Sequence, residues 1–167
     1  MSSISARGPR IRELSARQIE IVLRRNNVGR IGFRRDERLE LCPVHYVYAD
    51  GCIYGRTSLG AKYDTWLSRP PVVFEVDEIT GIFDWRSVVV HGTISILRAR
   101  GAKAEPFAYW NAVAAIRSFM PDAFTERDAL PRRLAVFRIQ PDELSGREAT
   151  RVKGWDSPML SVTEESL

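Results

Sequence analysis

The first organised segment of the chain is a run whose apolar positions repeat at helical spacing. Ile19 and Val22 fall on one face of this run. Ser15 precedes it as a candidate N-cap, and Gln18 follows three residues later, which is the spacing of a capping box. The pattern predicts a helix over about residues 16–25, which the sequence NNVG ends.

The pattern then changes to short runs rich in Val, Ile, Tyr and Phe, which is typical of strands. Asp50-Gly51 separates two of the runs and predicts a tight hairpin, because this pair favours the primed turns that match strand twist. Five strands before about residue 97 predict a β-barrel or a β-sandwich. The runs are VGRIGF, LELCPVHYVYA, CIYGRT, PVVFEV and WRSVVVHGTISIL, and the sequence DEITGIFD separates the last two.

Two further helices and one more strand are predicted. AKYDTWLSRP predicts a short helix that ends before Pro70, and PFAYWNAVAAIRSFM has apolar residues at helical spacing. RRLAVFRIQP returns to a strand over about residues 134–139. The last stretch shows no periodicity, and Trp155 is its candidate for docking on a neighbour. We therefore divide the chain into an N-terminal arm, a single folded domain and a C-terminal tail, with bounds 1–13, 14–145 and 146–167.

Composition narrows the class of protein. Hydrophobic residues make up 44% and charged residues 28% of 167 residues, which is typical of one soluble globular domain. No apolar run approaches the length of a membrane span, and the first residues lack the apolar core of a signal peptide, so we expect a cytoplasmic protein. Cys42 and Cys52 lie in strand-like runs without CxxC spacing, so we interpret both as buried thiols rather than as zinc ligands or a redox pair.

The net charge of +4 and the pI of about 9.4 do not by themselves indicate a nucleic-acid partner. The arginines are dispersed, acidic residues nearly balance them, and the sequence has no aromatic-basic motif of a nucleic-acid module. A basic surface would equally attract an anionic cofactor or metabolite.

The stretch YGRTSLGAK, residues 54–62, joins a predicted strand to the short helix and has two interpretations. It is either a solvated turn, or a seat for a phosphate on which hydroxyls and an ammonium group converge. These nine residues alone do not decide between the two.

The order and spacing of several motifs resemble those of the pyridoxamine 5′-phosphate oxidase-like family of flavin-binding split barrels. The motifs are VGRIGF, PVHY, RTSxGxK, FEVDE and WxSVVVxG, and the resemblance covers about residues 14–145. Within this family, the chain resembles the branch of the nitroimidazole-resistance proteins. It differs from true pyridoxamine phosphate oxidases in lacking their C-terminal arginine-containing substrate motif, so vitamin B6 oxidation is not the expected activity.

The resemblance implies a mainly β fold, namely a six-stranded antiparallel split β-barrel. It also implies a homodimer with flavin mononucleotide (FMN) in two clefts between the subunits, or a deazaflavin cofactor, which related split barrels use. Carried over to this chain, it implies a phosphate site, a flavin-ring site with contacts largely through the backbone, and a third segment that reaches the flavin. The phosphate site comprises Arg56, Thr57, Ser58 and Lys62. The flavin-ring site comprises Val44, His45 and Tyr46. The third segment comprises Trp85, Arg86 and Ser87.

Several of these residues have plainer interpretations. A lone strand histidine such as His45 is more often packed than catalytic, and Trp85 is equally an anchor of a core or an interface. Asp77 and Glu78 are adjacent on a strand and point to opposite faces, so we expect a polar strand end or ion pairs with arginines rather than a catalytic pair.

Two classes of function remain open. The first is a flavin-dependent oxidoreductase that acts on a small molecule stacked on the ring. The second is a flavin-binding or electron-carrier protein without turnover. The catalytic residues, the substrate and the electron donor stay unassigned.

Overall fold

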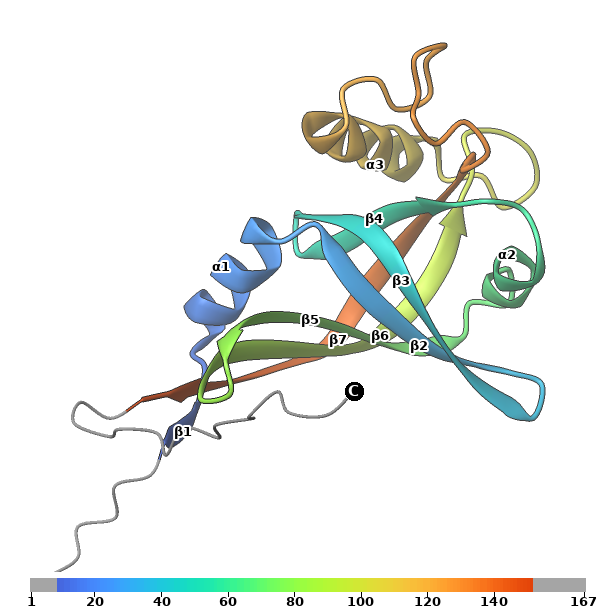
Figure 1. Cartoon of the computed structure of the whole chain (residues 1–167). Helices are drawn as coiled ribbons and strands as arrows, with labels where there is room; N and C mark the ends of the chain where they lie inside the picture. The colour runs from blue at the N-terminus through green and yellow to red at the C-terminus, as the bar shows by residue number, and fades with distance from the viewer. Residues whose placement is uncertain (1–8, 152–167) are drawn as a thin grey trace, which may run out of the picture.

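The computed structural model describes residues 9–151, and the strands of this part of the chain form one antiparallel sheet that closes on itself (Figure 1). The last strand, β7, pairs with β4 on one side and with β6 on the other, so six strands complete a ring. This arrangement confirms the predicted six-stranded antiparallel barrel. Its strands are β2 (Val28–Arg35), β3 (Arg38–Ala49), β4 (Cys52–Thr57), β5 (Pro71–Gly81), β6 (Asp84–Leu97) and β7 (Ala135–Thr150).

The predicted hairpin between β3 and β4 is confirmed. Asp50 and Gly51 both have positive φ angles, of 50° and 73°, and the strands pair directly on either side of them. Positive φ at both central positions is what a type I′ turn requires, so the Asp-Gly pair sets the register of this hairpin.

All three predicted helices are present. In α1 (Ala16–Arg25), the Ser15 side chain accepts from the backbone N–H of Gln18, and the Gln18 side chain accepts from the Ser15 N–H, which confirms the capping box. Of the other two helices, α2 (Ala61–Trp66) joins β4 to β5, and α3 (Pro106–Phe119) joins β6 to β7.

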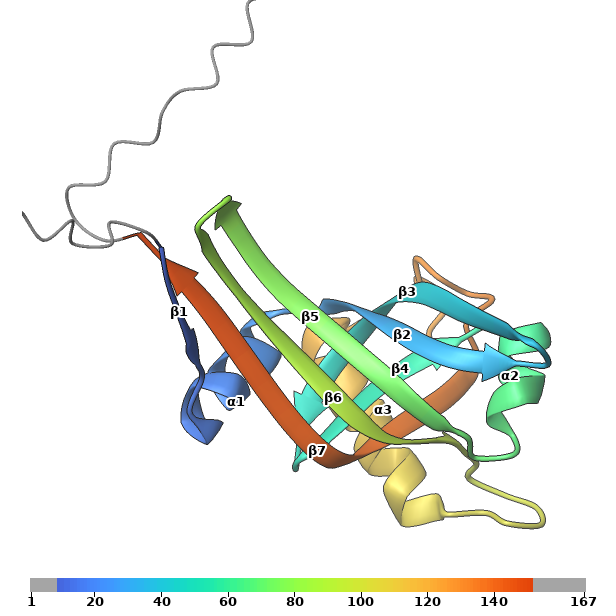
Figure 2. The ribbon, with the colours of Figure 1, turned by 90° about the horizontal axis from the view of Figure 1, so that it is seen from below.

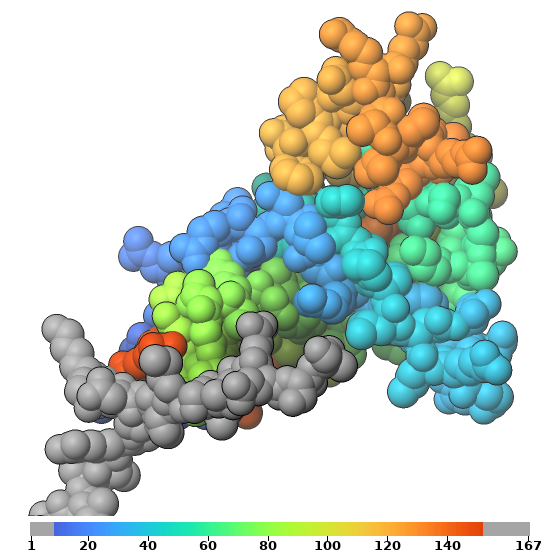
Figure 3. Space-filling view, viewed as in Figure 1, coloured from blue at the N-terminus to red at the C-terminus, as the bar shows by residue number. Residues whose placement is uncertain are grey.

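The barrel interior is filled mainly by apolar and aromatic side chains. Trp66, at the end of α2, is fully buried and packs edge-on against Phe33 and Phe137, with ring centroids 5.6 and 5.2 Å apart. A second apolar cluster lies between α3 and the outer face of the barrel, where α3 contributes Val113 and Ile116. In the space-filling view, α3 and the loop after it stand above the rest of the barrel (Figure 3).

Three sequence predictions about the strands need correction. The last strand does not end near residue 139 but continues to Thr150, and residues 10–13 of the predicted arm form a strand, β1 (Arg10–Glu13), that pairs with its end. The long β7 crosses the barrel and carries β1 at its far end (Figure 2). The sequence DEITGIFD is not a separate loop, because β5 runs to Gly81 and β6 begins at Asp84. Trp155 lies outside the described residues.

Candidate functional site

The three predicted ring contacts alternate across β3. Val44 and Tyr46 point into the barrel core and are buried, whereas the side chain of His45 points outward and is exposed. The Tyr46 hydroxyl donates to the carbonyl of Leu23, and burial raises the pKa of this phenol. Only His45 therefore presents its side chain on the outer face, and any contact of Val44 or Tyr46 with a ligand passes through the backbone.

The backbone of Tyr46 already has a partner. Its N–H donates to the carbonyl of Asn27 at 2.9 Å, and its carbonyl accepts from the Asn27 side-chain amide at 3.3 Å. A contact between Tyr46 and a flavin ring stays a prediction.

The β4–α2 corner contains the predicted phosphate residues, in three different environments. Thr57 is buried at the end of β4, Ser58 is exposed just beyond it, and Lys62 is half-buried in the first turn of α2. Burial raises the pKa of the Cys42 thiol on β3, and the nearby ammonium group of Lys62 opposes this rise. Lys62 therefore lies close to β3, and the described residues give it no ion-pair partner.

Arg56 does not present its guanidinium to solvent. Both of its terminal nitrogens donate to the carboxylate of Asp128, with Nη2 2.7 Å from Oδ1, and both side chains are almost fully buried. The guanidinium also lies over the ring of Phe124, 5.0 Å from its centroid. This geometry does not support a direct contact of Arg56 with a phosphate, because its paired nitrogens are already bound and desolvated.

Asp128 is the anchor of the loop between α3 and β7. Besides Arg56, its carboxylate accepts from the backbone N–H groups of Phe124 and Leu130, each at 2.8 Å. The hydrogen bonds from Arg56 hold the pKa of this carboxyl well below its usual range, against the effect of burial. Sequence reasoning missed Asp128, because a single aspartate in a polar loop carries no distinguishing signal.

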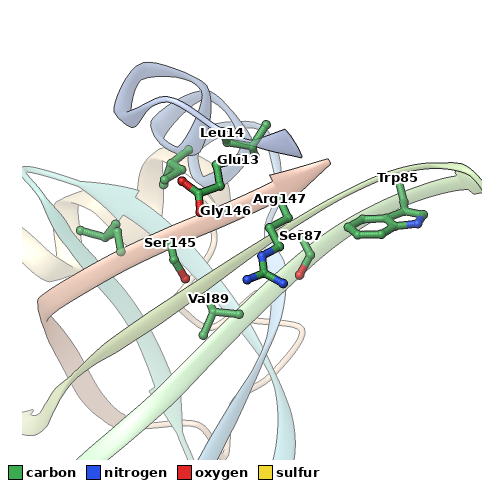
Figure 4. A pocket seen from close by; sticks show the side chains of 10 residues that line it. Glu13, Leu14, Trp85, Ser87, Val89, Ser145, Gly146 and Arg147 are labelled. Carbon is green, nitrogen blue, oxygen red and sulfur yellow. The ribbon is translucent and has the colours of Figure 1, made fainter. Parts of the chain in front are cut away.

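The third predicted segment, Trp85 to Ser87, lies on β6, and its first and last residues face a cavity of about 470 Å³ (Figure 4). Trp85 and Ser87 line this cavity together with Arg147 of β7, whose side chain extends toward Ser87. Sequence reasoning placed Arg147 in the tail and so missed it. The polar sequence QPDELSGREAT lacks the alternation that identifies a strand.

Arg86 points away from this cavity and is held by a buried carboxylate. Its Nε donates to Oε2 of Glu148 at 2.9 Å, and Arg12 of β1 donates to Oε1. Burial would raise the pKa of Glu148, but the hydrogen bonds from the two arginines outweigh it and keep the pKa below its usual range. The triad ties β1 and β6 to β7, which gives Arg86 a structural partner.

A single chain brings together only part of the predicted site. The β3 segment and the β4–α2 corner are neighbours, since β3 pairs with β4. Trp85 and Ser87 lie on β6, which β2 and β5 separate from β3 in the sheet order.

Another part of the outer face of the barrel, on β3, β2 and β5, is apolar and exposed. Leu41 on β3 lies beside Gly32 on β2, which lies beside Val73 on β5, and the two apolar side chains are 70% and 38% exposed. Together with Leu39 they line a groove of about 570 Å³. We call this surface, Leu39, Leu41 and Val73, the apolar face.

Other expectations have simple outcomes. Asp77 and Glu78 form ion pairs with Arg30 and Arg25, as predicted for a polar strand end. Cys52 is buried as expected, whereas Cys42 is half-buried. Within residues 9–151, no group of His, Cys, Asp and Glu side chains could hold a metal ion. None of the described helices has the length and apolar character needed to cross a membrane.

The comparison with known proteins identifies the family. Residues 15–148 match the family model of pyridoxamine 5′-phosphate oxidase, so the chain belongs to that family. An FAD-binding protein from Mesorhizobium loti is 31% identical, with 84% of this chain and 99% of that chain covered and a TM-score of 0.67.

Two more distant structures share the fold. An FAD-binding protein from Mycobacterium smegmatis is 21% identical, covers 83% of this chain and 98% of its own, and has a TM-score of 0.61. A candidate 5-nitroimidazole antibiotic resistance protein from Bacteroides thetaiotaomicron is 14% identical, with 84% of this chain and 88% of that chain covered and a TM-score of 0.63. These similarities support the fold.

Proposed function

We propose that this protein binds a flavin nucleotide and that Lys62 and Ser58 contact its phosphate. The observation that carries the proposal is the half-buried Lys62, which has no ion-pair partner among the described residues and lies close to β3 in a chain of the pyridoxamine 5′-phosphate oxidase family. An ammonium group and a hydroxyl on one short segment suit a phosphate ester. Thr57 borders the same segment from its buried position, and His45 offers its side chain to the ring.

The form of the flavin has two candidates. The sequence resemblance favours FMN, whereas the 31%-identical relative from Mesorhizobium loti is an FAD-binding protein. Both carry the phosphate that the proposal requires. A deazaflavin would present a phosphate to the same residues.

We further propose that the site is completed by a second copy of the chain. Trp85 and Ser87 lie apart from Lys62 within one subunit, and they would reach the cofactor only across an interface. The apolar face is exposed, and an exposed apolar surface of this kind suits contact with another protein surface.

The proposed activity is oxidation or reduction of a small molecule stacked on the ring, in the cytoplasm, without nucleic acid or membrane as partner. The flavin would supply hydride or single-electron transfer, while the chain supplies binding and orientation. The competing function is flavin binding without turnover.

One set of measurements tests the proposal. The visible spectrum of the purified protein should show bound flavin, and chromatography of the released cofactor should identify it as FMN, FAD or a deazaflavin. Continued consumption of NADH, NADPH or reduced deazaflavin, with a small-molecule electron acceptor present to reoxidise the flavin, would support an enzyme, whereas a single stoichiometric reduction would support a carrier. Failure to bind any of these cofactors on reconstitution would refute the proposed function.

A further inference from the structure

Arg133 lies beside the candidate site, on a loop to which the sequence assigned no role. Its Nη1 is 3.1 Å from Nδ1 of His45. A guanidinium has donors and no acceptor, so the imidazole nitrogen accepts in this contact. The half-buried side chain of Arg133 is therefore held against the one predicted ring residue that points outward from β3.

The backbone that carries Arg133 is fixed by the buried pair described above. The Asp128 carboxylate accepts from both terminal nitrogens of Arg56, Nη1 and Nη2, and from the N–H of Leu130. The carbonyl of Leu130 in turn accepts from the N–H of Arg133 at 3.0 Å. A continuous series of hydrogen bonds thus runs from β4 through the loop to Arg133.

Strand register places this loop next to the predicted phosphate residues. Thr57, the last residue of β4, pairs with Ala135, the first residue of β7. The chain just before Ala135, which carries Arg133, therefore approaches the sheet at the end of β4, where Thr57 and the adjacent Ser58 lie. Within residues 9–151, neither Arg133 nor Lys62 forms an ion pair with a carboxylate, so the charge of each is available to an anion.

We propose that Arg133 is a cofactor-binding residue whose guanidinium contacts the phosphate-bearing part of the flavin nucleotide, alongside Lys62. The inference rests on the proposed function and names a further residue of the same site. Arg56 then acts indirectly, by holding Asp128 and with it the loop that presents Arg133. The sequence led us to expect the guanidinium of Arg56 at the phosphate. In this proposal the guanidinium of Arg133, from the loop before β7, takes that place.

The test compares Arg133→Met with Arg132→Met. Arg132 is the matched control, because it is adjacent and exposed and its side chain makes no hydrogen bond or ion pair in the described structure. Each protein is stripped of flavin and titrated with FMN, FAD and riboflavin by fluorescence quenching. Loss of one charge-assisted contact should weaken FMN and FAD binding about tenfold or more in Arg133→Met. Riboflavin binding, and all three affinities of Arg132→Met, should stay within about twofold of wild type.

A third variant, Arg133→Lys, keeps the charge and should recover part of the lost FMN affinity, which a merely structural role of the side chain would not predict. Equal FMN and FAD affinities in Arg133→Met and Arg132→Met would overturn the inference, as would an equal loss for riboflavin. If Lys62→Ala still weakens FMN binding in that case, the proposed function stands while the role of Arg133 falls. If the wild-type protein binds no flavin nucleotide, both fall.

Discussion

Arg56 shows how far the role of one residue depends on a partner distant in the sequence. The local sequence YGRTSLGAK presents this arginine as one of several phosphate contacts, and nothing nearby distinguishes it from Lys62. Its actual partner, Asp128, comes 72 residues later. The local pattern drew attention to the hydroxyl and cationic groups at the β4–α2 corner. It could not show which of the two cations, Arg56 or Lys62, pairs with a buried carboxylate.

The buried pair makes a prediction about stability. Asp128→Asn should lower the free energy of unfolding at pH 7 by about 3–5 kcal/mol, because it leaves the Arg56 guanidinium buried without its counter-charge. The measurement is urea unfolding of both proteins, followed by circular dichroism. A double variant, Arg56→Met with Asp128→Asn, should be more stable than Asp128→Asn alone, since it leaves no unpaired buried charge and keeps an acceptor for the loop N–H groups.

The same pair predicts a pH dependence. The pKa of Asp128 is held below its ordinary value in the folded protein. The stabilisation that its charge contributes is therefore fully present above its pKa in the unfolded chain, which is about 3.9. It is lost as pH falls further, through the folded pKa. The unfolding free energies of wild type and Asp128→Asn should therefore differ by a constant amount from pH 7 to pH 5 and converge below about pH 4. A constant difference down to pH 2 would show that the charge of Asp128 is not responsible.

At the scale of the elements, the sequence identified those whose signals are local. The capping box of α1 and the Asp50-Gly51 turn each specify their structure within a few residues, and both are confirmed. The second half of β7 has no such signal, because Gly146 and the polar residues around it replace the usual alternation. A methyl group on Gly146 would lie within 3.1 Å of Leu14 and Ile19. The close packing of α1 and of the residue before its cap against β7 therefore explains the glycine at this position.

The cap of α1 can be tested directly. Ser15→Ala removes the acceptor for the Gln18 N–H and should destabilise the protein by about 1 kcal/mol. Ser15→Asp keeps an acceptor at this position and should restore most of the loss. Thermal unfolding of the three proteins measures the effect. Identical midpoints for Ser15→Ala and wild type would show that the capping box adds no measurable stability.

At the scale of the whole molecule, the ring of six strands was predictable, but the arrangement of the site was not. The number of strand-like runs and the family resemblance were enough for the barrel. The separation of Trp85 from Lys62 follows from strand order, which the runs alone do not reveal. A site that one barrel leaves divided leads to the proposal that two barrels complete it.

This proposal predicts the oligomeric state. Light scattering at micromolar concentration should give twice the chain mass of 19.0 kDa. Leu41→Arg, which puts a charge on the apolar face, should give monomers and weaken flavin binding at the same time. Ile21→Arg is the control, because Ile21 is exposed on α1, away from that face. A monomeric wild-type protein that binds flavin stoichiometrically would contradict the shared site.

The proposed phosphate site at the β4–α2 corner is tested most directly by one pair of titrations, of FMN and riboflavin, on wild type and Lys62→Ala. Removing the ammonium group should cost about 1.5–3 kcal/mol of FMN binding, or roughly ten- to a hundredfold in affinity. Riboflavin has the same ring without the phosphate, so its weaker binding should change by less than about twofold. Equal losses for both ligands, or no loss for either, would contradict the account and return Lys62 to the role of a solvated residue at a turn.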